Sequence, residues 1–168
     1  PFVVHGRSEG LDFEYPYLDI DNEGAFHDAG RLLVQLGHRR IALINGQNTQ
    51  TFAIFRERGL RRAVETAGLV LEPGNIRSIP MTEENGYRSA RSLLERTDRP
   101  TAILCSSLIM TMGVMRAARD LDIEVPRELS LISHDDVFAW LRPETFPVPL
   151  STTRSSIRAA GARIAARL

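Results

Sequence analysis

The side chains best suited to chemistry come directly after predicted strands, and the densest group is His134, Asp135 and Asp136. Two carboxylates beside an imidazole could bind a metal ion or exchange protons with a substrate. Adjacent aspartates at the end of a strand diverge, so one ion would need further ligands, and the sequence identifies none. We therefore favour Asp135 as a hydrogen-bond acceptor for a ligand over loop capping, and we expect neither a metal nor a cofactor.

Arg56 is the second candidate for contact with a ligand. It shares a predicted helix with Arg58, Arg61 and Arg62, and such a run of charges is typical of a solvated face. Arg56 differs because it lies only one turn into the helix, close to the ends of the strands. There its planar guanidinium could bind hydroxyls or a carboxylate through two parallel hydrogen bonds.

Several classes of chemistry are excluded or disfavoured. The chain contains no lysine, which removes Schiff-base, P-loop and lysine-base mechanisms. It has no G-x-S-x-G, G-x-G-x-x-G or G-x-x-x-x-G-K-[ST] motif, so a hydrolase serine and a nucleotide site are disfavoured. Ser107 follows a predicted strand and could contact a ligand, or it could cap the helix that begins at Leu108.

The elements that must position these residues alternate along the chain. Short apolar runs bounded by glycine or polar residues predict strands, and apolar residues spaced three and four apart predict helices. This alternation with short connections is typical of a doubly wound α/β domain with a parallel sheet. After Ser133 we expect a proline-rich loop. The predicted strands are 2–5, 17–20, 40–45, 76–79, 101–105 and 129–133, and the predicted helices are 22–36, 51–67, 83–96, 108–121 and about 155–168.

Open parallel sheets bind ligands beyond the carboxyl ends of their strands, because the loops and the helix N-termini converge there. The residues that follow the predicted strands are mostly neutral or charged hydrogen-bonding types. Phe52 and Met81 add apolar surface close to them. This mixture suits a polyol or a sugar.

Composition narrows the cellular setting. The 168 residues are 43% apolar and 25% charged, which is typical of one globular domain. The 21 basic and 21 acidic side chains cancel, so any contact with DNA must lie elsewhere. A single cysteine, Cys105, and the lack of an apolar stretch of roughly 18 residues point to the cytoplasm and against a membrane span. The first residue is Pro1, and we expect the chain to begin inside a larger protein.

The methionines of the predicted helix 108–121 suggest a subunit contact. Met110, Met112 and Met115 do not share one helix face, so some must be exposed unless another chain covers them. We therefore predict a homodimer with Met112 and Met115 at its interface.

An ordered series of motifs spans nearly the whole chain, and it resembles the LacI/GalR family of transcriptional regulators. Each motif is weak alone, but their order is highly specific. The matching motifs are Asp21-Asn22-Glu23-Gly24-Ala25, Leu36-Gly37-His38-Arg39-Arg40-Ile41-Ala42, Arg56-x-x-Gly59, Pro100-Thr101-Ala102-Ile103, Met110-x-x-Gly113, Val125-Pro126, Asp135-Asp136 and Pro149-Leu150-Ser151-Thr152-Thr153.

The resemblance implies half of a bilobed module similar to periplasmic sugar-binding proteins of type I, with the second lobe only partly present. Residues 1–20 would be the last strands of the N-terminal lobe and 21–145 the C-terminal lobe. Residues 146–168 would be a hinge crossing and a helix that returns to the N-terminal lobe. Operator DNA would be bound only through an N-terminal helix-turn-helix that this chain lacks.

The same resemblance assigns ligand contacts. In the family, the Arg of R-x-x-G and the first Asp of the Asp-Asp pair hold effector hydroxyls, which maps those roles onto Arg56 and Asp135. The stacking position falls near Met81. The chain departs from the family at Ser107-Leu108, where most members have Asn-Asp, and at Gly6, where many have Asp. The first change removes an amide contact and the second a carboxylate.

We therefore interpret the chain as the sugar-binding core of a cytoplasmic transcriptional regulator, and not as an enzyme. The main alternative is a periplasmic sugar-binding protein of a transporter, which would share the fold. An enzyme that uses Asp135 and Asp136 is a weaker alternative, because no phosphate loop or metal-ligand set accompanies the pair.

Overall fold

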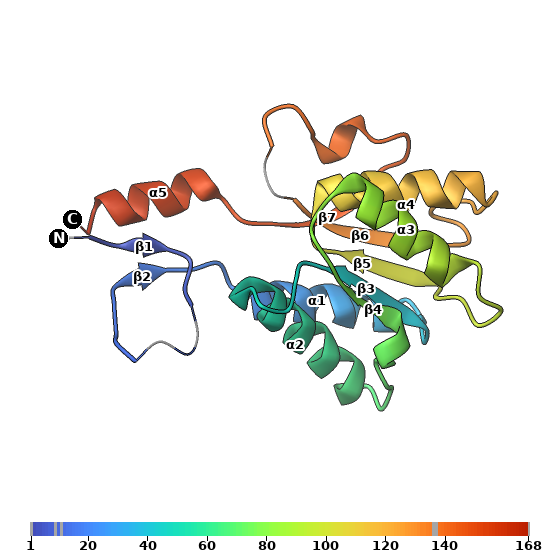
Figure 1. Ribbon diagram of the computed structural model, residues 1–168, viewed down its shortest axis with the longest axis horizontal. Coiled ribbons are helices and arrows are strands. Elements are labelled where there is room, and N and C mark those ends of the chain that lie inside the picture. The colour runs from blue at the N-terminus through green and yellow to red at the C-terminus, as the bar shows by residue number, and fades with distance from the viewer. Residues whose placement is uncertain (1, 9, 11, 136–137, 168) are drawn as a thin grey trace.

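A five-stranded parallel sheet forms the centre of the molecule (Figure 1). The computed structural model describes residues 2–8, 10, 12–135 and 138–167, with the side chain of Asp135 left out. The strand order is β4-β3-β5-β6-β7, so the chain winds in opposite directions from β3, and the switch point lies between β3 and β5. The expected doubly wound α/β architecture is confirmed. The strands are β3 (Ile41–Asn45), β4 (Ile76–Ser78), β5 (Ala102–Cys105), β6 (Ser130–Asp135) and β7 (Ser151–Arg154).

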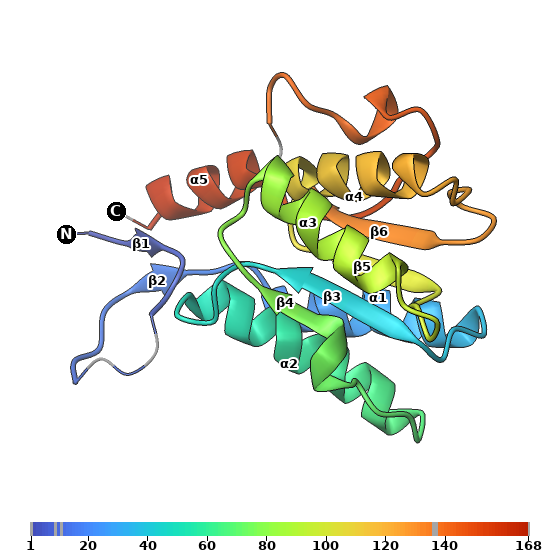
Figure 2. The ribbon, with the colours of Figure 1, turned by 45° about the vertical axis from the view of Figure 1, so that its right-hand side comes forward.

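Two pairs of helices cover the two faces of this sheet (Figure 2). Alternate residues of β3 divide between them: Ile41 and Leu43 pack with α1 and α2, whereas Ala42 and Ile44 pack with α3 and α4. Because side chains alternate across a strand, a continuous apolar run supplies both cores at once. The helices are α1 (Asn22–Gln35), α2 (Thr51–Thr66), α3 (Glu83–Leu94) and α4 (Leu108–Asp120).

Local sequence sets the helix ends. Asp21 caps α1, where its carboxylate accepts a hydrogen bond from the Gly24 amide at 2.8 Å. Thr82 caps α3 in the same way. Gly37 and Gly68 follow α1 and α2 with φ of 94° and 71°, a region that glycine enters without strain. The predicted helices and strands are confirmed, with ends that differ by at most three residues.

Glycines allow each helix pair to pack closely. A Cβ atom on Gly59 of α2 would overlap the backbone carbonyl of Glu23 in α1. A Cβ atom on Gly113 of α4 would overlap the carbonyl of Glu83 in α3. The glycines of the Arg56-x-x-Gly59 and Met110-x-x-Gly113 motifs therefore fix how near the two helices of each pair can lie.

The segment before the last helix corrects one expectation. We predicted a loop through residue 154, but Ser151–Arg154 forms β7, which pairs in parallel with β6. Its residues are exposed or half-buried. The four residues of this edge strand, Ser-Thr-Thr-Arg, are all polar, so no apolar run reveals it in the sequence.

A smaller unit lies at the carboxyl edge of the main sheet, where both termini also lie (Figures 1 and 2). Strands β1 (Val4–His5) and β2 (Tyr17–Leu18) pair in parallel there, beside helix α5 (Ile157–Ala165). None of the described residues of α5 is buried. Within the described residues, no helix has the length and apolarity needed to cross a membrane.

We expect Gly59→Ala to lower the free energy of unfolding by about 2–3 kcal/mol, because the added methyl group must push α2 away from the Glu23 carbonyl. Gly161→Ala in α5 is the matched control, since no described atom lies within 4 Å of its Cβ position. That control should gain about 0.5–1 kcal/mol from helix propensity. Urea denaturation of both variants measures the difference, and equal stability of the two would contradict the packing argument.

Candidate ligand-binding site

A hollow of about 420 Å³ opens at the carboxyl edge of the main sheet, between α2 and the β1–β2 segment. Its volume lies in the usual range for sites that bind small molecules. Four residues chosen from the sequence, Gly6, Phe52, Arg56 and Met81, line it together. The remaining lining residues are His5, Arg7, Ser8, Asp19, Ile20, Asn22, Thr49, Gln50 and Thr51.

Arg56 is the most firmly held side chain of the hollow. The residue is only 5% exposed. Its Nε donates to Asn22 Oδ1 and its Nη1 donates to the Ser106 carbonyl oxygen, each at 2.8 Å. The guanidinium carbon lies 5.1 Å from the ring centroid of Phe26 and 4.8 Å from that of Phe52. These contacts fix the direction of the guanidinium.

Asn45 connects three elements at the switch point of the sheet through hydrogen bonds. Its Oδ1 accepts hydrogen bonds from the Ser106 hydroxyl at 2.6 Å and from the Gly46 amide at 2.9 Å. Its Nδ2 donates to the Ala53 carbonyl at 2.8 Å. One buried amide thus joins the ends of β3 and β5 to the first turn of α2, the helix that carries Arg56.

His134 is a neutral structural residue. It is 3% exposed, and its Nδ1 lies 2.9 Å from the Thr153 hydroxyl oxygen in β7. Burial is the main cause that lowers the pKa of His134 to about 3, and the nearby positive charge of Arg56 contributes to the same shift. The imidazole therefore carries no charge at neutral pH. Among the described residues, no group of three or more His, Cys, Asp or Glu is placed to hold a metal ion.

Two residues chosen from the sequence are not brought to this hollow by any described contact. Ser107 is buried and caps α4, with its hydroxyl accepting from the Met110 amide at 3.2 Å. The capping alternative therefore describes the observed contact of Ser107, and a ligand contact at Ser107 stays a prediction. The backbone of Asp135 ends β6 opposite Arg154. The side chain of Asp135 and the whole of Asp136 lie outside the described residues.

Arg7 and Asp19, which also follow predicted strands, line the same hollow. Arg7 Nε lies 3.5 Å from Asp19 Oδ2, and both residues line the hollow beside Gly6. Each follows one of the two short opening strands. The expectation that ligands bind beyond the strand ends includes both residues, but it also includes many others and gives no order among them.

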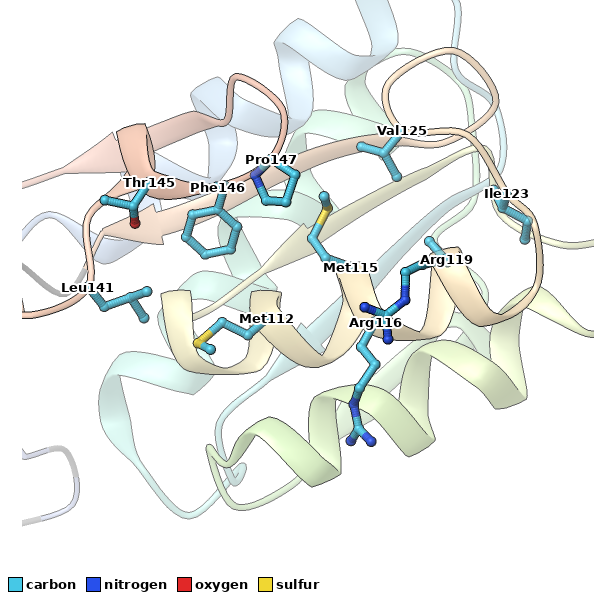
Figure 3. A pocket seen from close by; sticks show the side chains of 11 residues that line it. Met112, Met115, Arg116, Arg119, Ile123, Val125, Leu141, Thr145, Phe146 and Pro147 are labelled. Carbon is cyan, nitrogen blue, oxygen red and sulfur yellow. The ribbon is translucent and has the colours of Figure 1, made fainter.

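A second hollow, of about 460 Å³, lies on the outer face of α4 (Figure 3). Met112 and Met115 project from α4 toward Leu141, Phe146 and Pro147 of the segment that precedes β7. Met110 is fully buried in the core, whereas Met112 is 38% exposed. The prediction that these methionines face different environments is confirmed.

A parallel α/β lobe with a ligand-sized hollow at its strand ends, joined to a further β segment, defines a periplasmic-binding-protein-like ligand-binding module. Comparison with known proteins agrees. Residues 31–168 match the model of the periplasmic binding protein-like domain family, and the chain belongs to that family as a LacI/GalR-type effector-binding domain.

Two relatives illustrate the similarity. The HTH-type transcriptional regulator AglR of Rhizobium meliloti (strain 1021) is 55% identical over 168 residues, which are 100% of this chain and 47% of AglR. The HTH-type transcriptional repressor PurR of Escherichia coli O1:K1 / APEC is 35% identical over 138 residues, covering 82% of this chain and 40% of PurR. The chain thus spans about half the length of these relatives or less.

Solved structures share the fold. A regulatory protein of the LacI family from Chloroflexus aggregans has a TM-score of 0.90 at 34% identity, covering 98% of this chain and 58% of that one. The transcriptional regulator CelR in complex with cellobiose has a TM-score of 0.90 at 28% identity, covering 100% of this chain and 51% of that one.

We expect the chain to lose about 2 kcal/mol of unfolding free energy through His134 when the pH falls from 7 to 5. The pKa of His134 is 6.5 in the unfolded chain and about 3 in the folded chain, so between these pH values only the unfolded chain binds the proton. The contribution of His134 to the free energy of unfolding is therefore complete above pH 6.5 and is lost progressively between pH 6.5 and 3. Urea denaturation at both pH values measures the loss.

His134→Asn supplies the control, because an amide can keep a hydrogen bond to Thr153 without titrating. The variant should lose about 2 kcal/mol less than the parent over the same interval. Burial also lowers the pKa of His38, but that contribution is common to both proteins and cancels in the comparison. An equal loss in parent and variant would contradict the role given to His134.

Proposed function

We propose that this chain is the effector-binding core of a transcriptional regulator and that its hollow receives a small sugar. The observation that carries the proposal is Arg56, which Asn22 and Ser106 hold in one orientation at a ligand-sized hollow. The site binds its ligand and performs no chemistry on it.

The lining of the hollow suits a sugar. Asn22, Thr49 and Gln50 offer amide and hydroxyl groups to the polar edges of such a ligand, and Phe52 and Met81 offer apolar surface to its C–H faces. CelR, a structural relative, was solved with cellobiose, which supports the same ligand class here. Asp135 stays part of the proposal on the strength of its position in the family motif.

Closure of two lobes would convert binding into a signal. We assign residues 1–20 to the end of the first lobe, 21–145 to the second lobe and 146–168 to a crossing that leads back, with β7 as the edge strand of the second lobe. A ligand held between lobes favours the closed state and so shifts the hinge. In the full-length protein, a helix-turn-helix would bind operator DNA, as the names of the HTH-type relatives indicate. The regulator would act in the cytoplasm.

The regulator is favoured over the periplasmic transport protein because the relatives are named as regulators. A homodimer completes the proposal. Met112 and Met115 present an apolar surface on α4, flanked by Arg116 and Arg119 (Figure 3), and a second copy of the chain would cover it.

In the full-length protein, we expect a mono- or disaccharide effector to raise the melting temperature, because it binds only the folded state. Arg56→Ala and Asp135→Ala should each weaken that binding by about 1.5–3 kcal/mol, the usual value for hydrogen bonds to charged groups. Titration calorimetry measures the change. Arg62→Ala, an exposed arginine on the same helix, is the control. Unchanged affinity in both site variants would refute the site.

We expect the full-length protein to sediment as a dimer at micromolar concentration. Met112→Arg should shift it toward monomer, because a charge would then be buried in the interface. Val70→Arg is the control, since Val70 is an exposed apolar residue away from α4. A monomeric parent, or a Met112→Arg variant that dimerises as the parent does, would contradict the interface.

A further inference from the structure

Arg7 and Asp19 form a charged pair that lines the same hollow as Arg56. Arg7 follows β1 and Asp19 follows β2, so both come from the opening segment, whereas Arg56 comes from α2. The pair and Arg56 therefore reach the hollow from different parts of the fold. A ligand between them would touch both.

Phe55 orients the Arg7 guanidinium. The guanidinium carbon lies 4.2 Å from the centroid of the buried Phe55 ring in α2. A guanidinium that stacks on a ring by its flat face keeps its N–H groups at the edge, where they can meet acceptors. This contact holds the Arg7 guanidinium against the Phe55 ring without using its hydrogen bonds.

The hydrogen bonds of Arg7 are long compared with those of Arg56. Its Nη1 lies 3.4 Å from the Tyr17 hydroxyl and its Nε lies 3.5 Å from Asp19 Oδ2, whereas Arg56 makes two bonds of 2.8 Å. The Arg7 side chain is 37% exposed. A guanidinium carries five N–H donors, so Arg7 retains donor capacity toward the hollow.

Asp19 provides a fixed acceptor next to this donor. Its Oδ1 accepts a hydrogen bond from the Ile20 amide at 2.8 Å, which holds the carboxylate in place. The side chain is 18% exposed and lines the hollow. The carboxylate that the sequence lacks at Gly6 is thus present in the same hollow, carried by a different strand end.

We propose that Arg7 and Asp19 bind two neighbouring hydroxyl groups of a neutral sugar. The Asp19 carboxylate accepts a hydrogen bond from one hydroxyl, and the Arg7 guanidinium donates a hydrogen bond to the oxygen of the other. This inference rests on the proposed sugar-binding function and specifies which class of sugar the site prefers. The two charges of the pair cancel, and the Asp19 carboxylate repels a second anion. The pair therefore selects against a sugar that would place a phosphate or carboxylate group beside Asp19.

The test uses calorimetric titration of the full-length protein with neutral glucose, maltose and cellobiose and with anionic glucose 6-phosphate and glucuronic acid. The parent should bind a neutral sugar and not its anionic counterparts. Arg7→Gln and Asp19→Asn should each weaken the neutral sugar at least tenfold. Asp19→Asn should also reduce the ratio of the affinities for neutral and anionic sugars at least tenfold, because the variant lacks the negative charge that repels an anion.

Two further variants sharpen the result. Arg7→Lys keeps the charge but loses the planar fork, so it should also weaken the neutral sugar. Arg88→Gln breaks an exposed ion pair with Glu84 on α3 and should leave affinity within twofold of the parent. The ligand-free melting temperature of each variant shows whether it folds, and exposed pairs of this kind contribute little to it.

The outcomes separate the two proposals. Affinity within twofold of the parent in Arg7→Gln and Asp19→Asn, together with a loss in Arg56→Ala, overturns the role of the pair and leaves the sugar site standing. A parent that binds only the anionic sugars also overturns the role of the pair. Absence of binding to every sugar tested overturns the pair and the proposed function together.

Discussion

The buried guanidinium of Arg56 is the interaction on which the site depends. A charge that is taken out of water must find hydrogen bonds, and Arg56 finds them on α1 and at the end of β5, through Asn22 and the Ser106 carbonyl. It therefore joins three elements at the switch point of the sheet. Gly59, one turn further along α2, permits the close approach to α1 that brings Asn22 within reach.

The hollow has two chemically different sides. On the α2 side, short hydrogen bonds and two aromatic rings hold Arg56 rigid. Arg7 and Asp19 make a longer contact with each other and are more exposed. The hollow therefore combines one buried, firmly held cation with a more exposed charged pair.

In each helix pair, on either face of the sheet, a glycine allows the two helices to pack closely. Gly59 lets α2 approach α1, and Gly113 lets α4 approach α3. Close packing of α3 and α4 leaves Met110 in the core and turns Met112 outward. Close helix packing thus accompanies the hollow near Arg56 in one pair and the exposed side chain of Met112 in the other.

The sequence by itself determined the order of strands and helices, their caps and the α/β class, because apolar periodicity and capping residues act over a few neighbouring positions. It also selected Gly6, Phe52, Arg56 and Met81, since strand ends converge in any parallel sheet. Only the tertiary structure decided that β7 is a strand, because a polar edge strand is defined by its partner. Likewise, only the folded chain assigns Ser107 to a helix cap and brings Arg7 to Asp19, because contacts between distant segments leave no local pattern.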